Sequence, residues 1–225
     1  MKVLELFKGS GSISKHYKNN ESVQVISLDF DKRYEPDILT DIMEWNYKEF
    51  PTNYFDIIWA SPECKVYSNL QYTHIIAKGK TQKDYKKKMK WSSLEELGKV
   101  QEENKIYINK TIEIIEYFKP KYYFIENPFY SNIWNYVDNK KYLDSYVSVD
   151  YCAFGYRYKK PTKILTNKKL EDKRCVCTGN PKHGMRIGAI SKQFRQERPN
   201  IQEPDNTTLL EKYSIPPLLL KYLLD

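Results

Sequence analysis

Two side chains able to do covalent and acid–base chemistry follow strand-like runs of this sequence. Cys64 closes the stretch Ser61-Pro62-Glu63-Cys64 after the apolar run 55–59, and Glu126 follows a second apolar run, 122–125. A deprotonated thiol is a nucleophile, and a carboxylate can bind or exchange protons with a substrate. A thiol and a carboxylate that both follow strand-like runs therefore predict a site for covalent catalysis. The alternatives are a small buried cysteine and a carboxylate that caps a helix or forms a surface ion pair.

A glycine-rich turn precedes these residues, as it does in sites that bind nucleotide-type cofactors. Gly9-Ser10-Gly11 follows the first strand-like run, and glycine lets a chain turn tightly and approach a ligand closely. Asp29, 18 residues after Gly11, stands where a ribose diol would be held, and Asp41 could hold an exocyclic amine. An ordinary turn with solvated acids is the alternative. A dinucleotide competes here with S-adenosylmethionine, and Cys64 and Glu126 favour the latter.

The order of the elements that would position these residues predicts an α/β fold. Strands are expected at 3–7, 22–28, 37–41, 55–60 and 122–125, and helices from residue 12 to 19 and from 94 to 118. A long loop is expected from 61 to 91, and residues 132–142 are expected to be helical or irregular. Runs 146–154 and 162–166 predict an antiparallel hairpin, and residues 209–224 a packing helix interrupted by Pro216-Pro217. The pattern predicts a mostly parallel, doubly wound sheet with this hairpin at its C-terminal end and a small irregular extension.

Composition bounds the partners and the compartment. The 225 residues carry 37 Lys and Arg against 29 Asp and Glu, a net charge of +8. This charge favours a polyanion such as nucleic acid, although compositional bias could explain many lysines. The run 83–91 mixes lysines with aromatic residues, which suits contact with phosphates and bases. No stretch nears the roughly 20 apolar residues that span a bilayer. The N-terminus does not resemble a signal peptide, so we expect an intracellular, non-secreted protein in the host cytoplasm or associated with the nucleoid.

Four segments together resemble the DNA cytosine-5 methyltransferase family, in its compact phage and viral branch. Phe7-Lys8-Gly9-Ser10-Gly11 resembles the family's F-x-G-x-G loop, and Ser61-Pro62-Glu63-Cys64 its Pro-Pro-Cys nucleophile motif. Glu126-Asn127-Pro128 resembles Glu-Asn-Val, and residues 151–162 resemble a segment of the phage and viral branch that precedes a strand ending in Asn. The order and spacing match from Val3 to Asn167, about three quarters of the chain.

The resemblance implies a Rossmann-like methyltransferase fold and S-adenosylmethionine-dependent methylation of cytosine C5 in DNA. It implies that Cys64 adds to cytosine C6 and that Glu126 binds the N3 and amino edge of the base. Asn127 would orient that site, and Arg157 would contact the base carbonyl. The target base would leave the stack to reach the thiol. The implied cofactor contacts are Phe7, Gly9, Ser10, Gly11, Asp29, Phe30, Asp41, Ile42 and Pro62.

The resemblance also predicts an unusual organisation. Residues 1–167 would form the catalytic domain, 168–208 a small irregular segment in place of a full target-recognition domain, and 209–225 a C-terminal helix that packs back on the catalytic domain. Because that segment is short, we expect low or short sequence specificity, or dependence on a protein partner. The sequence does not determine the oligomeric state.

Departures from the family pattern leave two other functions open. Lys8, Glu63 and Pro128 stand in place of Ala, Pro and Val. Ser12 replaces a glycine, and Tyr213-Ser214-Ile215-Pro216 stands near the place of a Gly-Asn motif. One alternative is the same chemistry on RNA, and the other is a degenerate, non-catalytic nucleic-acid-binding protein.

The cysteines near the C-terminus could bind a metal, but we expect no metal site. Cys175, Cys177 and His183 form C-x-C-x5-H, which with a fourth ligand such as Cys152 could bind zinc. The spacing is unusual and only three ligands are local, so free thiols are the expectation.

Overall fold

The computed structural model describes residues 1–72, 93–156, 159–175 and 213–225, which form one seven-stranded sheet with helices on both faces. Its strands run in the order β3-β2-β1-β4-β5-β7-β6. The main elements are β1 (Lys2–Leu6), α1 (Ser12–Tyr17), β2 (Gln24–Asp29), β3 (Ile38–Leu39), β4 (Ile57–Ala60), α3 (Leu94–Phe118), β5 (Tyr122–Pro128), β6 (Tyr146–Asp150), β7 (Pro161–Thr166) and α6 (Pro217–Leu224).

Five strands are parallel, β7 runs antiparallel to them, and β6, which is antiparallel to β7, runs in their direction. β1 pairs in parallel with β2 and β4, β2 with β3, and β4 with β5. β7 then pairs antiparallel with both β5 and β6, so the hairpin joins the sheet through its second strand. The α/β class, the mostly parallel sheet and the terminal hairpin predicted from the sequence are confirmed.

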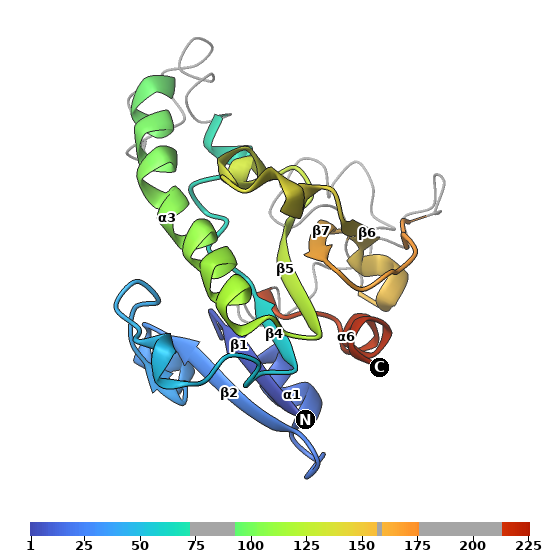
Figure 1. Cartoon of the computed structure of the whole chain (residues 1–225). Coiled ribbons are helices and arrows are strands. Elements are labelled where there is room, and N and C mark those ends of the chain that lie inside the picture. The colour runs from blue at the N-terminus through green and yellow to red at the C-terminus, as the bar shows by residue number, and fades with distance from the viewer. Residues whose placement is uncertain (73–92, 157–158, 176–212) are drawn as a thin grey trace.

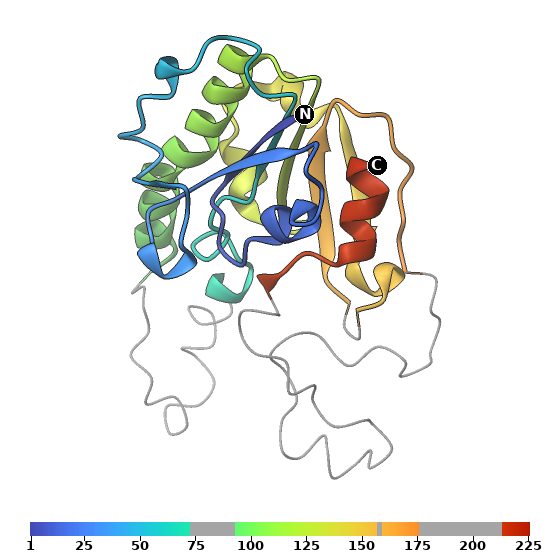
Figure 2. The ribbon, with the colours of Figure 1, turned by 90° about the horizontal axis from the view of Figure 1, so that it is seen from below.

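Alternating side chains divide the core into two layers, one on each face of the sheet. Along β1, Leu4 and Leu6 pack in the cluster under α3, whereas Val3 packs in the cluster under α1 and α6. α3 therefore covers one face, and α1 and α6 cover the other (Figures 1 and 2). Strand ends of the parallel part meet at one edge, where α/β folds place ligand sites.

Helix α3 begins and ends where its sequence predicts. The Ser93 side chain accepts a hydrogen bond from the Glu96 backbone N–H (3.1 Å), and acidic residues occupy the first turn. Lys119 is left-handed (φ 48°) just after the last turn, and Pro120 follows. Buried Ile108, Ile112 and Ile115 face the sheet, so the apolar periodicity fixes the orientation of the helix.

Three expectations need correction. The run 146–154 is not one strand: β6 ends at Asp150, and residues 151–154 form a short 3₁₀ helix that ends at Gly155 (φ 88°). Residues 70–72 are helical within the expected loop 61–91, of which 73–92 lie outside the described residues. β5 continues to Pro128, so Glu126 lies within the strand and not beyond its end.

The prolines of the last helix stand at the start of α6. Pro217 is its first residue and Pro216 precedes it, because proline lacks only an N–H that the first turn leaves unpaired. Of the helix expected before them, 209–212 lie outside the described residues and residue 213 is helical.

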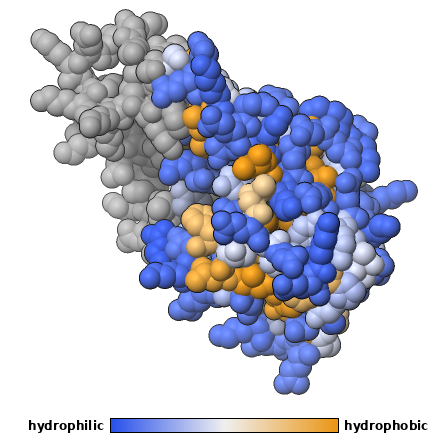
Figure 3. Space-filling view, turned by 60° about the vertical axis from the view of Figure 1, so that its left-hand side comes forward, coloured by the Kyte–Doolittle hydropathy of each residue, from blue (hydrophilic) through white to orange (hydrophobic). Residues whose placement is uncertain are grey.

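The face that comes forward when the left side of Figure 1 is turned toward the viewer is largely hydrophilic, with small apolar patches (Figure 3). No helix among the described residues is both long enough and apolar enough to cross a membrane.

Candidate active site

Cys64 lies four residues beyond the central strand β4, in a turn tied to the end of β5. Ala60, the last residue of β4, pairs with Ile125 of β5, which continues to Pro128, so Glu126 directly follows the residue beside the end of β4. The Asn127 side-chain amide donates to the Pro62 carbonyl (2.8 Å), and Asn127 is 1% exposed. This buried hydrogen bond holds the cysteine turn against the strand that carries Glu126.

Glu126 is a buried carboxylate with two polar partners that the sequence did not single out as site residues. It is 7% exposed and accepts a hydrogen bond from the Tyr151 hydroxyl (3.1 Å). Lys160 Nζ lies 3.5 Å from Glu126 Oε1 and donates to the Tyr151 hydroxyl (3.4 Å). The same ammonium lies 4.5 Å from the Tyr151 ring centroid. A buried carboxylate with these partners is oriented and charge-compensated.

The Cys64 thiol is influenced by both charges of that pair. Partial burial raises its pKa, the positive charge of Lys160 lowers it, and the negative charge of Glu126 raises it again. We expected Lys65 and the basic run after it to supply the positive field. Lys65 is exposed and run 83–91 lies outside the described residues. Among the residues that the structure describes, Lys160 is a cation that lowers the pKa of the thiol.

We predict that Lys160→Met slows alkylation of Cys64 at neutral pH and moves its pH dependence to higher pH. Removing the ammonium removes an effect that lowers the thiol pKa, so less thiolate is present at any given pH. Lys160→Arg keeps the charge and should stay close to wild type. Peptide-level mass spectrometry after iodoacetamide treatment measures Cys64 apart from the other cysteines. An unchanged profile in Lys160→Met would contradict this electrostatic role.

The glycine turn adopts backbone conformations that few side chains tolerate. Gly9 (φ 47°) and Gly11 (φ 66°) are left-handed, and Phe7 shares that conformation (φ 57°). Asp29, at the end of β2, accepts hydrogen bonds from the backbone N–H groups of Gly9 (3.0 Å) and Asp31 (2.9 Å). Its first structural effect is therefore to hold the glycine turn beside β2.

Other residues expected to bind the cofactor surround this turn. Phe30 is 73% exposed directly after Asp29, and an exposed ring beside a carboxylate suits an adenosine. Each Asp29 oxygen makes one hydrogen bond to the backbone, which leaves acceptor capacity for a diol. Asp41 accepts from the Met43 backbone N–H (2.9 Å), and Ile42 is buried. Residues at the ends of β1, β2 and β3 thus fit an adenosine-containing cofactor.

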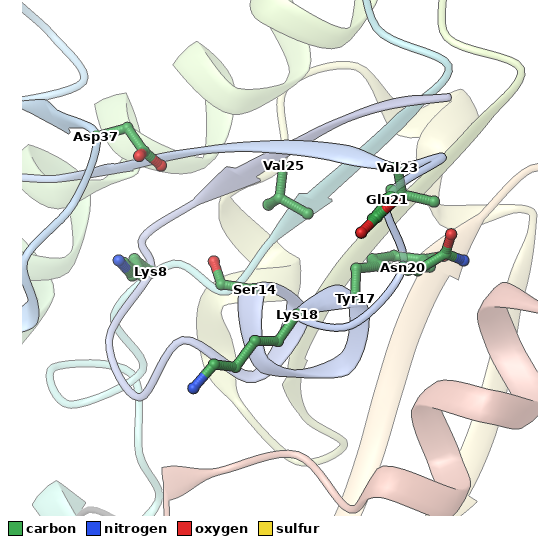
Figure 4. A pocket seen from close by; sticks show the side chains of 9 residues that line it. All are labelled: Lys8, Ser14, Tyr17, Lys18, Asn20, Glu21, Val23, Val25 and Asp37. Carbon is green, nitrogen blue, oxygen red and sulfur yellow. The ribbon is translucent and has the colours of Figure 1, made fainter.

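Two cavities lie beside α1, away from the thiol. One of about 360 Å³ separates α1 from β2, with Lys8, Lys18 and Val25 among its lining residues (Figure 4). The other, of about 260 Å³, lies between the glycine turn, α1 and the segment before α6, and Ser10, Ser12, Tyr156 and Ser214 line it. Neither is lined by Cys64 or Glu126.

Some expected residues cannot be placed. Arg157, Cys177 and His183 lie outside the described residues. Within the described ranges, no three His, Cys, Asp or Glu side chains are grouped as metal ligands would be. The Cys175 backbone N–H donates to Asp150 Oδ2 (2.7 Å), which ties that segment to the end of β6.

Comparison with known proteins identifies a full-length relative. No protein-family model matches the chain. Over 237 residues, covering 100% of this chain and 99% of the relative, it is 29% identical to a Frog virus 3 (isolate Goorha) protein described as a probable DNA (cytosine-5)-methyltransferase.

Solved structures with a similar arrangement are more distant and longer. The Entamoeba histolytica methyltransferase EhMeth has 14% identity and a TM-score of 0.49, over 77% of this chain and 56% of that one. A mutant of Spodoptera frugiperda DNMT2 has 16% identity and a TM-score of 0.45, over 80% and 56%. The chain spans about half the length of these structures, so the full-length viral relative is the comparison that bears on its family.

Proposed function

We propose that the chain belongs to the DNA cytosine-5 methyltransferase family and that it methylates cytosine C5 in DNA through a covalent adduct with Cys64. The observation that carries the proposal is a thiol just beyond β4 and a buried carboxylate within the neighbouring strand β5, with one lysine acting on both. The viral relative supports the choice of DNA and of cytosine C5.

The chemistry follows from the weakness of cytosine C5 as a nucleophile. The Cys64 thiolate adds to C6, which breaks the C5–C6 double bond and places electron density on C5. C5 then forms its bond to the methyl group, whose bond to the donor sulfur breaks, so that the donor would leave as S-adenosylhomocysteine. Transfer of the C5 proton to solvent restores the double bond and expels the thiolate, so the enzyme is regenerated. Glu126 binds the N3 and amino edge of the base and stabilises charge while the thiol adds.

The family implies S-adenosylmethionine as the methyl donor, and bound S-adenosylmethionine would supply an electrophilic methyl group. We propose that Phe7, Gly9, Ser10 and Gly11 approach it through their backbone, and that Asp29 accepts from its ribose hydroxyls. The exposed Phe30 ring, Asp41, Ile42 and Pro62 would complete the contacts, with Asp41 on the exocyclic amine. The left-handed glycine turn and the exposed ring support this assignment.

We propose that residues 1–167 form the catalytic domain, that 168–208 take the place of a larger target-recognition domain, and that 209–225 pack back on the catalytic domain. Burial of Leu219, Leu220 and Leu223 against α1 supports the last part. Arg157, beside the described Tyr156, is proposed to contact the base carbonyl. Because the recognition segment is short, we expect the enzyme to require few or no specific bases around the target cytosine, unless a protein partner selects the target.

Transfer of labelled methyl groups to DNA and RNA tests the substrate. We expect incorporation into DNA containing cytosine, 5-methylcytosine in the product, and a bisulfite map with few fixed positions around each site. Incorporation into RNA alone would overturn the choice of DNA. A protein that binds S-adenosylmethionine by calorimetry but methylates neither polymer would overturn the catalytic proposal.

A further inference from the structure

The segment before α6 is tied to the glycine turn by a long-range hydrogen bond. The Ile215 backbone N–H donates to Ser12 Oγ (3.0 Å), across 203 residues of sequence. Ser12 and Ile215 are 8% and 7% exposed, so the bond is shielded from water. Ser10 Oγ lies 3.0 Å from Ser12 Oγ and extends the contact into the turn itself. Ser12 and this segment are two of the places where the sequence departs from a family motif, and here they contact each other.

The neighbouring residue of the same segment contacts the hairpin side of the molecule. Ser214 Oγ and the Tyr156 hydroxyl lie 2.6 Å apart. Tyr156 stands edge-on to Tyr151, with ring centroids 5.7 Å apart and an interplanar angle of 86°. Its backbone N–H also donates to the Tyr151 carbonyl (3.3 Å). Tyr156 is therefore held by Ser214 on one side and by Tyr151 on the other.

Tyr151 completes the connection to the candidate catalytic carboxylate. It is fully buried, and its hydroxyl donates to Glu126 Oε1 (3.1 Å). A continuous series of contacts thus runs from the glycine turn to Glu126, and each member lies among the described residues: Ser10, Ser12, Ile215, Ser214, Tyr156, Tyr151, Glu126.

The segment is stiff enough to transmit position. Pro216 and Pro217 follow Ile215 directly and restrict its backbone, and α6 packs on α1 through Leu219, Leu220 and Leu223. A cavity of about 260 Å³ lies beneath it, lined by members of the series and by Lys15 and His16 of α1. The segment thus crosses over a cavity between two fixed contacts.

We propose that residues 214–215 act as a strap that positions Tyr156, and through it Tyr151 and Glu126, relative to the cofactor turn. This proposal rests on the proposed function, because it assigns Glu126 to the reacting base and residues 9–12 to the cofactor. Ser12, Ser214 and Tyr156 are positioning residues. They set the geometry of Glu126 when the cofactor turn is in its binding conformation.

Removing one hydroxyl at the Tyr156–Ser214 contact tests the strap. We expect Tyr156→Phe and Ser214→Ala each to lower the single-turnover rate of methyl transfer about 5-fold, the effect of one lost hydrogen bond of roughly 1 kcal/mol. The double variant should be no slower than either single variant, because both remove the same contact. KM for DNA should stay unchanged, since neither residue is assigned to DNA binding.

Tyr222→Phe is the matched control, because it removes a tyrosine hydroxyl that donates to the Glu171 carbonyl (2.8 Å) and lies outside the series. It should keep the wild-type rate. Ser12→Ala should both raise the calorimetric Kd for S-adenosylhomocysteine and lower the rate, since it cuts the strap at the cofactor turn. The pH–rate profile should differ from that of wild type in Tyr156→Phe and should be unchanged in Tyr222→Phe. Loss of folded protein alone would lower the rate without changing the shape of this profile.

Failure of the strap and failure of the function give different results. An active wild type whose Tyr156→Phe and Ser214→Ala variants keep full rate, or lose rate additively in the double variant, overturns the strap alone. A wild type that binds the cofactor and methylates no cytosine overturns the proposed function, and the strap falls with it.

Discussion

Cys64→Ser is expected to abolish methyl transfer, with a loss on the order of 10³-fold or more. A serine hydroxyl is almost wholly protonated near neutral pH, so addition to C6 would lack its nucleophile. The side chains are nearly the same size, and Cys64 is only partly buried, so the fold should persist. Affinity for S-adenosylhomocysteine should stay near wild type, because the glycine turn and Asp29 are unchanged.

DNA carrying 5-fluorocytosine gives a second measurement of the same step. Once the methyl group is on C5, fluorine cannot leave as a proton would, and the thiol stays bonded to C6. Wild type should therefore yield a denaturant-resistant protein–DNA complex, and Cys64→Ser should yield none. Cys175→Ser is the control, because it removes a thiol outside the candidate site and keeps the backbone N–H that donates to Asp150. Methylation by Cys64→Ser at the wild-type rate would disprove covalent catalysis.

Local pattern was sufficient to predict the elements around this site. Apolar runs bounded by turn residues give the parallel strands, and α3 spans 94–118 as its periodicity predicts. The sequence also predicts that Cys64 and Glu126 follow the ends of two strands of one sheet. β4 does pair with β5, and Cys64 lies beyond β4, but β5 continues to Pro128, so Glu126 lies within the strand. Their catalytic roles stay a prediction.

Long-range pairing decided what local pattern could not. A hairpin was predicted, but its sequence did not say which strand would lie beside β5. β7 takes that place, with Glu126 opposite Ile164, and Lys160 directly precedes β7. This brings Lys160 to the carboxylate. A lysine followed by a strand-starting proline near the predicted base-binding segment was the available signal.

Hydrogen bonds made by backbone groups also could not be predicted from the sequence. Asp29 was expected to face a ribose, and its hydrogen bonds to Gly9 and Asp31 depend on how the turn folds back on β2. The hydrogen bond between Ser12 and Ile215 joins residues whose separation no periodicity relates. Pro217 begins α6, since a proline in the first turn of a helix removes no hydrogen bond.

Glu126→Gln is expected to change two assays in opposite directions. Methyl transfer should fall about 10²- to 10³-fold, because the amide keeps the shape but cannot carry the charge that stabilises the base as the thiol adds. Alkylation of Cys64 at neutral pH should become faster. Glu126 raises the pKa of the thiol, so removing its charge lowers that pKa and increases the thiolate fraction.

The opposite signs separate a catalytic carboxylate from a structural one. If Glu126 only stabilised the fold, its loss would reduce methyl transfer through unfolded protein, and thermal unfolding would report that loss. Lys160→Met provides the counterpart, since it should slow alkylation where Glu126→Gln speeds it. Glu113→Gln is the matched control, an acid whose partners Tyr47 and Lys110 lie on the α3 side of the molecule. A Glu126→Gln enzyme with wild-type methyl transfer would remove Glu126 from the mechanism, because no step of base activation would then need its charge.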